Sequence, residues 1–167
     1  AKGRGRDCFL TPAGEELRPL IVHLGRWGQR WSRKPFRAYD LDVTVLMWDI
    51  HRRIRVSQLP PRRTVVRFEF RGMPKGSTAT RTWWLVLQRA DVDLCMKDPG
   101  FEVDLYVDAD LGALTAVWLG DLQLAEATRS GQLIIDGPRA LAQSFPNWLA
   151  LSSFANVERP APAATAR

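Results

Sequence analysis

The histidines and cysteines of this 167-residue chain are the side chains best suited to metal binding or nucleophilic chemistry. His23 and His51 have no cysteine or carboxylate at a spacing typical of a metal site. Cys8 and Cys95 are far apart and form no CxxC pair, which indicates two ordinary thiols in a reducing compartment. GxSxG, HExxH, P-loop and GxGxxG motifs are absent from the sequence. We therefore expect no catalytic residue, no metal and no cofactor.

The aspartates and tryptophans remain as candidates for a site. Asp91, Asp93, Asp104 and Asp108 alternate along predicted strands, which is more typical of a solvated sheet face than of a paired-carboxylate site. The seven tryptophans are a high count for this length. They fit two interpretations, a packed core or the wall of an apolar cavity, and both stay open.

The charge distribution points to a partner at one end of the chain. Residues 1–37 carry the whole net charge of +6, and the remainder is neutral. A basic arm on a neutral body is typical of contact with a polyanion, although a merely solvated terminus fits equally well. No apolar run reaches the roughly 20 residues of a membrane span. We expect a soluble, cytoplasmic protein.

A long amphipathic helix is predicted for residues 12–31. Thr11 and Pro12 form a strong helix start, and apolar residues then recur at steps of three and four. Such a helix needs a packing partner to be stable in water, so we expect a homodimer. The expected dimerisation residues are Leu17, Leu20, Ile21, Leu24 and Trp27. A linker is expected at 32–39 and a disordered tail at 158–167.

The body of the chain alternates between the two periodicities. It predicts a helix over about 42–53, with Asp40 or Asp42 as its cap and with Val43, Leu46, Met47 and Ile50 on one face. An antiparallel meander of four strands follows, and then more helices. Asp110 and Asp121 are the expected caps of helices at 111–119 and 122–129. A fifth strand and a last helix complete the pattern. The four strands are expected at 65–71, 81–88, 92–96 and 101–107, the fifth at 132–136 and the last helix at 138–145.

The first 31 residues resemble the end of an HxlR-type winged-helix transcriptional regulator. The resemblance rests on Leu10-Thr-Pro-Ala-Gly-Glu-Glu-Leu17 continuing to Leu24-Gly-Arg-Trp-Gly28. It implies that 1–31 form the end of the DNA-contacting wing and a dimerisation helix. The helix-turn-helix that would read DNA is absent and would lie upstream. The implied contacts with the DNA backbone are Lys2, Arg4 and Arg6.

Residues 40–157 resemble the sterol carrier protein type-2 fold. The stretch from Ala109-Asp-Leu-Gly-Ala-Leu to Ser130-Gly-Gln-Leu-Ile-Ile-Asp-Gly137 carries most of the likeness. It implies an α+β domain with a five-stranded, mostly antiparallel sheet covered by helices and an apolar cavity between them. The expected lining residues are Trp48, Phe68, Trp83, Trp118, Met47 and Met96.

Together the two resemblances imply a ligand-responsive bacterial transcriptional regulator. A small apolar effector in the body would change the geometry of a dimeric DNA-binding head. The alternative is a stand-alone intracellular carrier of lipids or other apolar molecules, whose basic N-terminus meets anionic membrane. A third hypothesis is an accessory domain of a hydrolase, since the fold is reused in that way.

Overall fold

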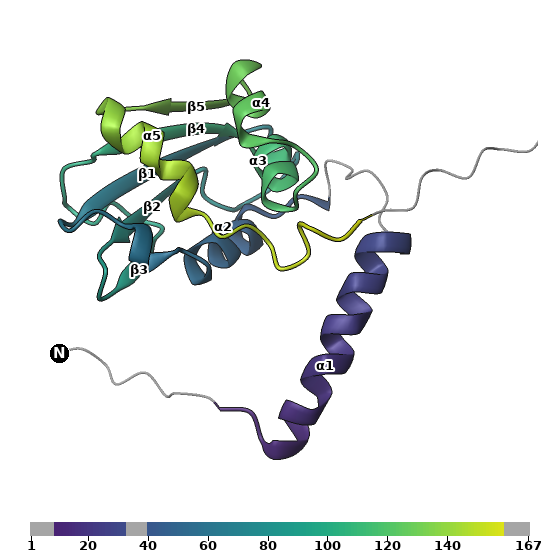
Figure 1. Ribbon diagram of the computed structural model, residues 1–167. Coiled ribbons are helices and arrows are strands. Elements are labelled where there is room, and N and C mark those ends of the chain that lie inside the picture. The colour runs from purple at the N-terminus through teal and green to yellow at the C-terminus, as the bar shows by residue number, and fades with distance from the viewer. Residues whose placement is uncertain (1–8, 33–39, 159–167) are drawn as a thin grey trace, which may run out of the picture. The chain divides into compact units, whose positions relative to one another are not determined.

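The computed structural model describes residues 9–32 and 40–158. The chain divides into two compact units, of which one comprises Ala1–Lys34 with Val157–Arg167 and the other Pro35–Asn156 (Figure 1). Three expectations fall outside the described residues. They are the wing contacts of Lys2, Arg4 and Arg6, the linker at 33–39 and the tail at 159–167.

The first unit contains one long helix. α1 spans Pro12–Trp27 and continues as a π-helical turn over Gly28–Ser32. Thr11 caps it, because its hydroxyl accepts a 3.2 Å hydrogen bond from the Gly14 N–H. The expected helix and its cap are confirmed. None of the residues of α1 is buried, so its apolar stripe is exposed.

The second unit is built on a five-stranded sheet in the order β3-β2-β1-β4-β5. β4 runs parallel to β1, and the other neighbouring pairs are antiparallel. This confirms the expected α+β fold with a mostly antiparallel sheet. The strands are Thr64–Arg71 (β1), Thr82–Leu87 (β2), Val92–Cys95 (β3), Leu105–Asp110 (β4) and Leu133–Asp136 (β5).

The place of β4 shows that the expected four-strand meander is wrong. β4 lies beside β1 instead of β3, and it begins at Leu105 instead of residue 101. Asp104 accounts for this, because its carboxylate accepts a 2.8 Å hydrogen bond from the Val65 N–H and pairs with Arg62 at 2.8 Å. The Asp104 N–H in turn donates to the Val65 carbonyl at 2.9 Å. These contacts join the start of β1 to the start of β4, in agreement with the parallel direction of the pair.

Helices pack on one face of this sheet and enclose the core (Figure 1). Phe68 of β1, Trp83 of β2 and Val107 of β4 are each 1% exposed within that core. The face of α2 predicted to be buried is confirmed, and Asp42 caps this helix by accepting from the Thr44 N–H at 2.7 Å. The helices are α2 (Val43–Arg52), α3 (Leu111–Trp118), α4 (Leu124–Arg129) and α5 (Arg139–Trp148), and the buried residues of α2 are Val43, Leu46, Met47 and Ile50.

The turn between α3 and α4 departs from the expectation at one helix cap. Asp110 caps α3 as expected, accepting from the Ala113 N–H at 2.9 Å. The expected Asp121 cap of α4 is wrong, since α4 starts at Leu124 with Gln123 at its cap position. The Asp121 N–H instead donates to the Ala116 carbonyl at 2.8 Å. That hydrogen bond closes the C-terminal end of α3, so Asp121 belongs to the turn and not to α4.

Candidate functional site

A pocket of about 200 Å³ lies where the end of α3, the start of α4 and the end of α5 meet. Its walls are mainly aliphatic, and the chain segment after α5 completes them. Among the described lining residues one side chain is charged. The lining residues are Arg55, Val117, Gly120, Leu122, Gln123, Leu124, Pro146, Leu149 and Leu151.

Gly120 shapes the pocket because the chain after α5 passes directly over it. Its φ of +80° lies in the left-handed region, and a Cβ added there would come within 2.4 Å of the Ala155 carbonyl oxygen. Any larger residue would therefore be strained in its backbone and would also displace this segment. The glycine lets residues 149–156 lie close to the end of α3.

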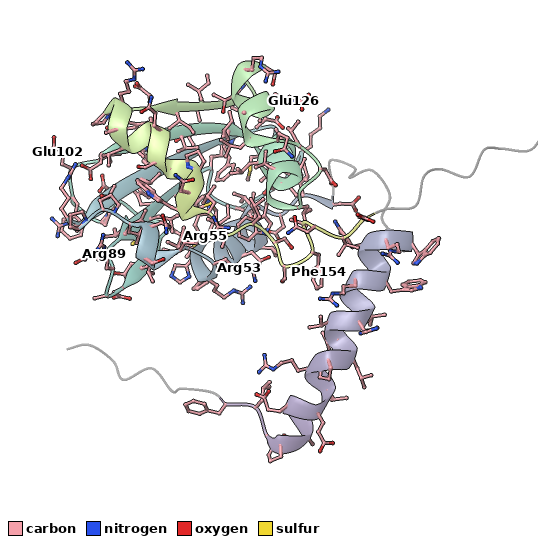
Figure 2. The ribbon with its side chains drawn as sticks, viewed as in Figure 1. Arg53, Arg55, Arg89, Glu102, Glu126 and Phe154 are labelled. Atoms are coloured by element: carbon pink, nitrogen blue, oxygen red, sulfur yellow. The ribbon has the colours of Figure 1, made fainter. Side chains whose placement is uncertain are left out.

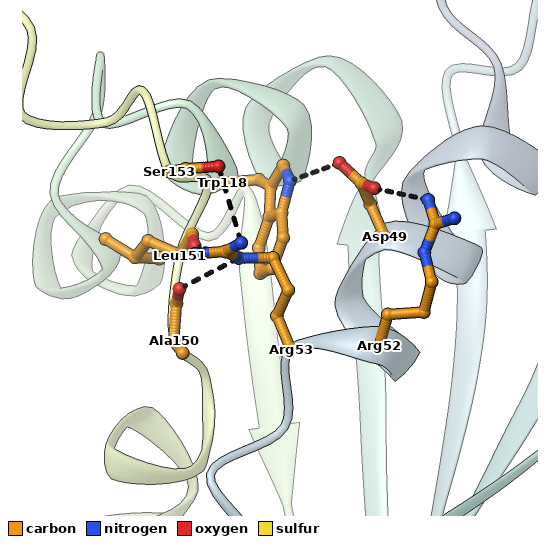
Figure 3. Close-up of polar contacts among 7 residues, drawn as sticks. All are labelled: Asp49, Arg52, Arg53, Trp118, Ala150, Leu151 and Ser153. Atoms are coloured by element: carbon orange, nitrogen blue, oxygen red, sulfur yellow. Dashed lines mark hydrogen bonds and ion pairs between the residues drawn. The ribbon is translucent and has the colours of Figure 1, made fainter. Parts of the chain in front are cut away.

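Arg53 and Trp118 both form hydrogen bonds with the same segment, and Figure 3 shows those of Arg53. Arg53 Nε donates to the Leu151 carbonyl at 2.8 Å and, at 3.4 Å, to the Ala150 carbonyl. The Ser152 N–H donates to the Trp118 carbonyl at 2.9 Å. Backbone carbonyls near the pocket are thereby satisfied, which leaves the aliphatic side chains to form its wall.

Trp118 also ties α3 to α2. Its Nε1–H donates to Asp49 Oδ2 at 3.3 Å, and Asp49 Oδ1 pairs with Arg52 at 2.7 Å (Figure 3). The Trp118 side chain is 3% exposed, so this hydrogen bond fixes the ring in the core next to the pocket-lining Val117.

Arg55, labelled in Figure 2, is the charged residue among the described lining residues of the pocket. Its backbone N–H donates to the Trp148 carbonyl at 2.8 Å, and neighbouring Ile54 forms a β-bridge with Leu149. One guanidinium nitrogen contacts the Asn147 carbonyl at 3.5 Å, near the limit for a hydrogen bond. The residue lines the pocket and is exposed, so solvent also reaches it. The arrangement suits a molecule with an apolar body and a polar or anionic end.

The lining residues expected from the sequence fall into two groups. Phe68, Trp83, Trp118 and Met47 are buried together in the core, at 0–3% exposure. Trp48 and Met96 are 47% and 60% exposed, outside that core. Trp48 packs edge-on against His51, with ring centroids 5.5 Å apart. None of the six is among the described lining residues of the pocket, and their role as ligand contacts stays a prediction.

The sequence analysis missed every described lining residue of the pocket. One signal was available, since Leu149 and Leu151 are apolar residues that follow the last predicted helix, in a segment where polar side chains are expected. The five residues expected to form a dimer interface on α1 have exposed fractions of 55–63%. They are Leu17, Leu20, Ile21, Leu24 and Trp27.

Three of the residues considered for chemistry have structural partners, namely His51, Asp104 and Asp108. His51 Nε2–H donates to the Val92 carbonyl at 2.7 Å and holds α2 to β3. Asp104 and Asp108 pair with Arg62 and Arg71. Within residues 9–32 and 40–158 there is no cluster of three or more metal-ligating side chains.

Cys95 lacks the features of a reactive thiol. Burial, and secondly the negative charge of Asp93, raise the pKa of this thiol above its ordinary value. Activated cysteines have the opposite shift.

The described part of the chain contains no helix that is both long and apolar enough to cross a membrane.

Comparison with known protein structures shows the same fold at low sequence identity. A double mutant of the sec-alkylsulfatase PisA1 matches 71% of this chain, with 14% sequence identity and a TM-score of 0.53. The match covers 18% of the sulfatase chain. The inverting sec-alkylsulfatase Pisa1 from Pseudomonas sp. matches 62% with 15% identity and a TM-score of 0.48, covering 16% of that chain. The chain thus spans less than a fifth of these sulfatases.

A smaller protein in this comparison is the UbiJ-SCP2 ubiquinone synthesis protein. It matches 79% of this chain and 95% of its own, with 23% identity and a TM-score of 0.42. No curated protein sequence matches the chain.

A family model settles the relationship of the body domain. The model of the SCP-2 sterol transfer family matches residues 57–150, which is more than half of the chain. This match begins after the segment that resembles winged-helix regulators, so that resemblance gains no support from it. The chain, with its mixed sheet and its apolar pocket under α3, α4 and α5, belongs to the SCP-2 sterol transfer family.

Proposed function

We propose that the second unit binds a small apolar molecule in the pocket between α3, α4 and α5. The observation that carries this is an aliphatic wall built from segments far apart in sequence, with Arg55 at its edge. Membership in the SCP-2 sterol transfer family supports binding or transfer of an apolar molecule. This is the carrier alternative from the sequence analysis, and the findings support it better than transcriptional control.

The ligand class follows from the size and charge of the pocket. A volume of about 200 Å³ is below the roughly 300–1,000 Å³ of drug-sized ligand pockets. The pocket therefore suits one end of an acyl chain or a similarly slender group. Arg55 would pair with a carboxylate or another anionic end of that ligand, since a guanidinium binds such groups with charge-assisted hydrogen bonds.

The proposal is tested by titrating the chain with decanoic acid and with decan-1-ol, which share an alkyl chain and differ in charge. Tryptophan emission and calorimetry report binding. We expect the acid to bind more tightly than the alcohol, and Arg55→Gln to remove most of that difference. Arg89→Gln is the matched control, because Arg89 donates to the Leu59 carbonyl at 3.0 Å and is not among the described pocket residues. Binding of neither compound would overturn the proposal.

We further propose that this unit acts by binding and catalyses no reaction of its own. His51, Asp104 and Asp108 have structural partners, and the pKa of Cys95 is raised. A DNA-binding regulator remains a prediction from residues 1–31, supported by the basic charge of that segment. Duplex DNA and anionic vesicles at matched salt would separate the regulator from the carrier.

A further inference from the structure

The apolar face of α1 has the spacing of a helix–helix seam. Its residues follow one another at alternating steps of four and three, a pattern that keeps side chains on a narrow line facing a partner helix. The leucines and tryptophan of this seam are 55–63% exposed. Trp31 lies one turn further, in the π-helical turn, and is 62% exposed. The seam residues are Ala13, Leu17, Leu20, Leu24 and Trp27.

We propose that α1 pairs with α1 of a second copy of this chain, and that the two helices run antiparallel. In that arrangement Leu20 packs against the partner's Leu24, and Leu17 against the partner's Trp27. The ends are complementary in size, because the small side chain of Ala13 lies opposite the partner's Trp31. Pro19 is on the outer side of the helix in this arrangement, where its missing N–H does not disturb the seam.

The charges beside the seam favour the antiparallel direction. Glu16 flanks the seam near the start of α1, and Arg30 lies in the π-helical turn that continues the helix at its other end. Antiparallel pairing brings Glu16 next to the partner's Arg30 on both sides of the two-fold axis, whereas parallel pairing places Glu16 next to the partner's Ile21. Arg30 Nε donates to the Glu158 carbonyl at 3.2 Å, and the guanidinium has further N–H donors for a carboxylate.

The glycines on the other flank indicate close approach of a partner. Gly28 has right-handed helical angles of −59° and −43°, and a Cβ added there would meet nothing within 4 Å. Neither backbone conformation nor crowding within the chain requires a glycine at this position, although glycine weakens a helix. Antiparallel pairing places Gly28 beside the partner's Gly14, where the absence of side chains leaves room for the adjacent tryptophans. The same glycines have no such use in a solvated helix.

A lipid surface is the rival occupant of this face. The helix carries Glu15 and Glu16 in or beside its first turn, and Glu16 lies at the border of the apolar face. An anionic bilayer would repel these carboxylates while it attracts the basic side chains of the same segment, whereas a second copy supplies Arg30 to Glu16 itself. A narrow seam with strict alternation also fits a helix better than the broad apolar face of an interfacial helix.

The experiment uses two single charge reversals in the full chain, Glu16→Arg and Arg30→Glu, examined by sedimentation at low salt. Each alone should weaken self-association about tenfold, because like charges then face each other twice. Mixing the two variants should restore association as a heterodimer, since every facing pair is again opposite in charge. Glu15→Arg is the control. Glu15 pairs with Arg18 of its own helix at 2.8 Å, so reversing the charge of Glu15 should leave the association constant unchanged.

Three outcomes would overturn the proposal. They are a wild-type chain that stays monomeric at all concentrations, reversals that leave the association constant unchanged, and a mixture that fails to recover. Vesicles of phosphatidylcholine and phosphatidylglycerol provide the last comparison. A monomer whose tryptophan emission shifts to the blue on these vesicles, with no such shift in a Trp27→Phe chain, would assign the face to lipid instead.

Discussion

Gly120 lies so close to Ala155 that a Cβ on the glycine would stand 2.4 Å from the Ala155 carbonyl oxygen. The contact joins the end of α3 to the segment that follows α5, two parts of the chain that both line the pocket. Hydrogen bonds also hold this segment: Arg53 donates to the Leu151 carbonyl, and the Ser152 N–H donates to the Trp118 carbonyl. The pocket therefore depends on how this segment is held, and the stability of that contact can be measured.

Gly120→Ala should destabilise the second unit more than a matched glycine substitution. Gly76 has the same φ of +80° with nothing within 4 Å of an added Cβ, so Gly76→Ala measures the backbone strain alone. We expect about 1 kcal/mol for Gly76→Ala and at least about 1 kcal/mol more for Gly120→Ala, because the latter also displaces backbone. Urea unfolding gives both values. Equal losses would show that the Ala155 contact contributes nothing.

The hydrogen bond between Trp118 and Asp49 should be visible in unfolding experiments. Trp118→Phe keeps a ring and removes the Nε1–H donor, so we expect a loss of about 1 kcal/mol for the hydrogen bond beyond that of a matched variant. Trp84→Phe is the match, because Trp84 Nε1 has no hydrogen-bond partner within the described residues. A loss for Trp118→Phe no larger than that for Trp84→Phe would contradict the role of Asp49.

Much of the fold could be predicted because its signals are local. The buried face of α2 follows from helical spacing, and the caps Thr11, Asp42 and Asp110 follow from side chains next to the helix they start. The place of β4 could not be predicted in this way. It depends on the contacts of Asp104 with Val65 and Arg62, which join residues about forty positions apart.

The site was harder to predict for a similar reason. The expectation selected large aromatic residues, and Phe68 and Trp83 instead fill the core. The pocket is lined by leucines from turns and from the segment after α5, which come together only through tertiary contacts. Composition cannot distinguish a tryptophan in a core from one in a wall. Trp48 illustrates this, since its place on α2 leaves it about half exposed.

Asp104→Ala should destabilise the sheet strongly, because the Asp104 side chain is only 17% exposed and both its carboxylate oxygens are in use. The change leaves the buried Val65 N–H without its 2.8 Å acceptor and removes the ion pair with Arg62. We expect a loss of about 1–3 kcal/mol, measured by urea unfolding. Asp98→Ala is the control and should cost less, because Asp98 accepts a hydrogen bond from the exposed Gly100 N–H in a turn. A loss below that of the control would contradict the account of β4.

The Cys95 thiol should react slowly with iodoacetamide at neutral pH. Burial, and secondly the charge of Asp93, raise its pKa, so the thiolate fraction is lower than in an ordinary cysteine. The rate should keep rising with pH beyond the point where an unfolded reference levels off. Asp93→Asn removes the smaller cause and should raise the neutral-pH rate by less than about tenfold. Mass spectrometry of a Cys8→Ser chain measures the rate, and a plateau at lower pH than the reference would contradict the shift.

Filling the pocket should abolish binding without unfolding the domain. Leu124→Trp adds volume at a half-buried position on the pocket wall. Ile134→Trp adds the same kind of side chain at a 51% exposed position on β5 and serves as the control. We expect decanoic acid binding to weaken at least about tenfold, or by about 1.4 kcal/mol, in the first variant alone. Equal affinity in both variants would place the ligand elsewhere.

The location of a bound alkyl chain tests the central claim most directly. Nuclear Overhauser contacts between methyl-labelled protein and decanoic acid would identify the residues that touch it. The account predicts contacts to the methyl groups of Leu122, Leu124 and Leu149, which line the pocket together with Val117. Contacts to the core side chain of Met47 or to exposed Met96, with none to these leucines, would contradict it.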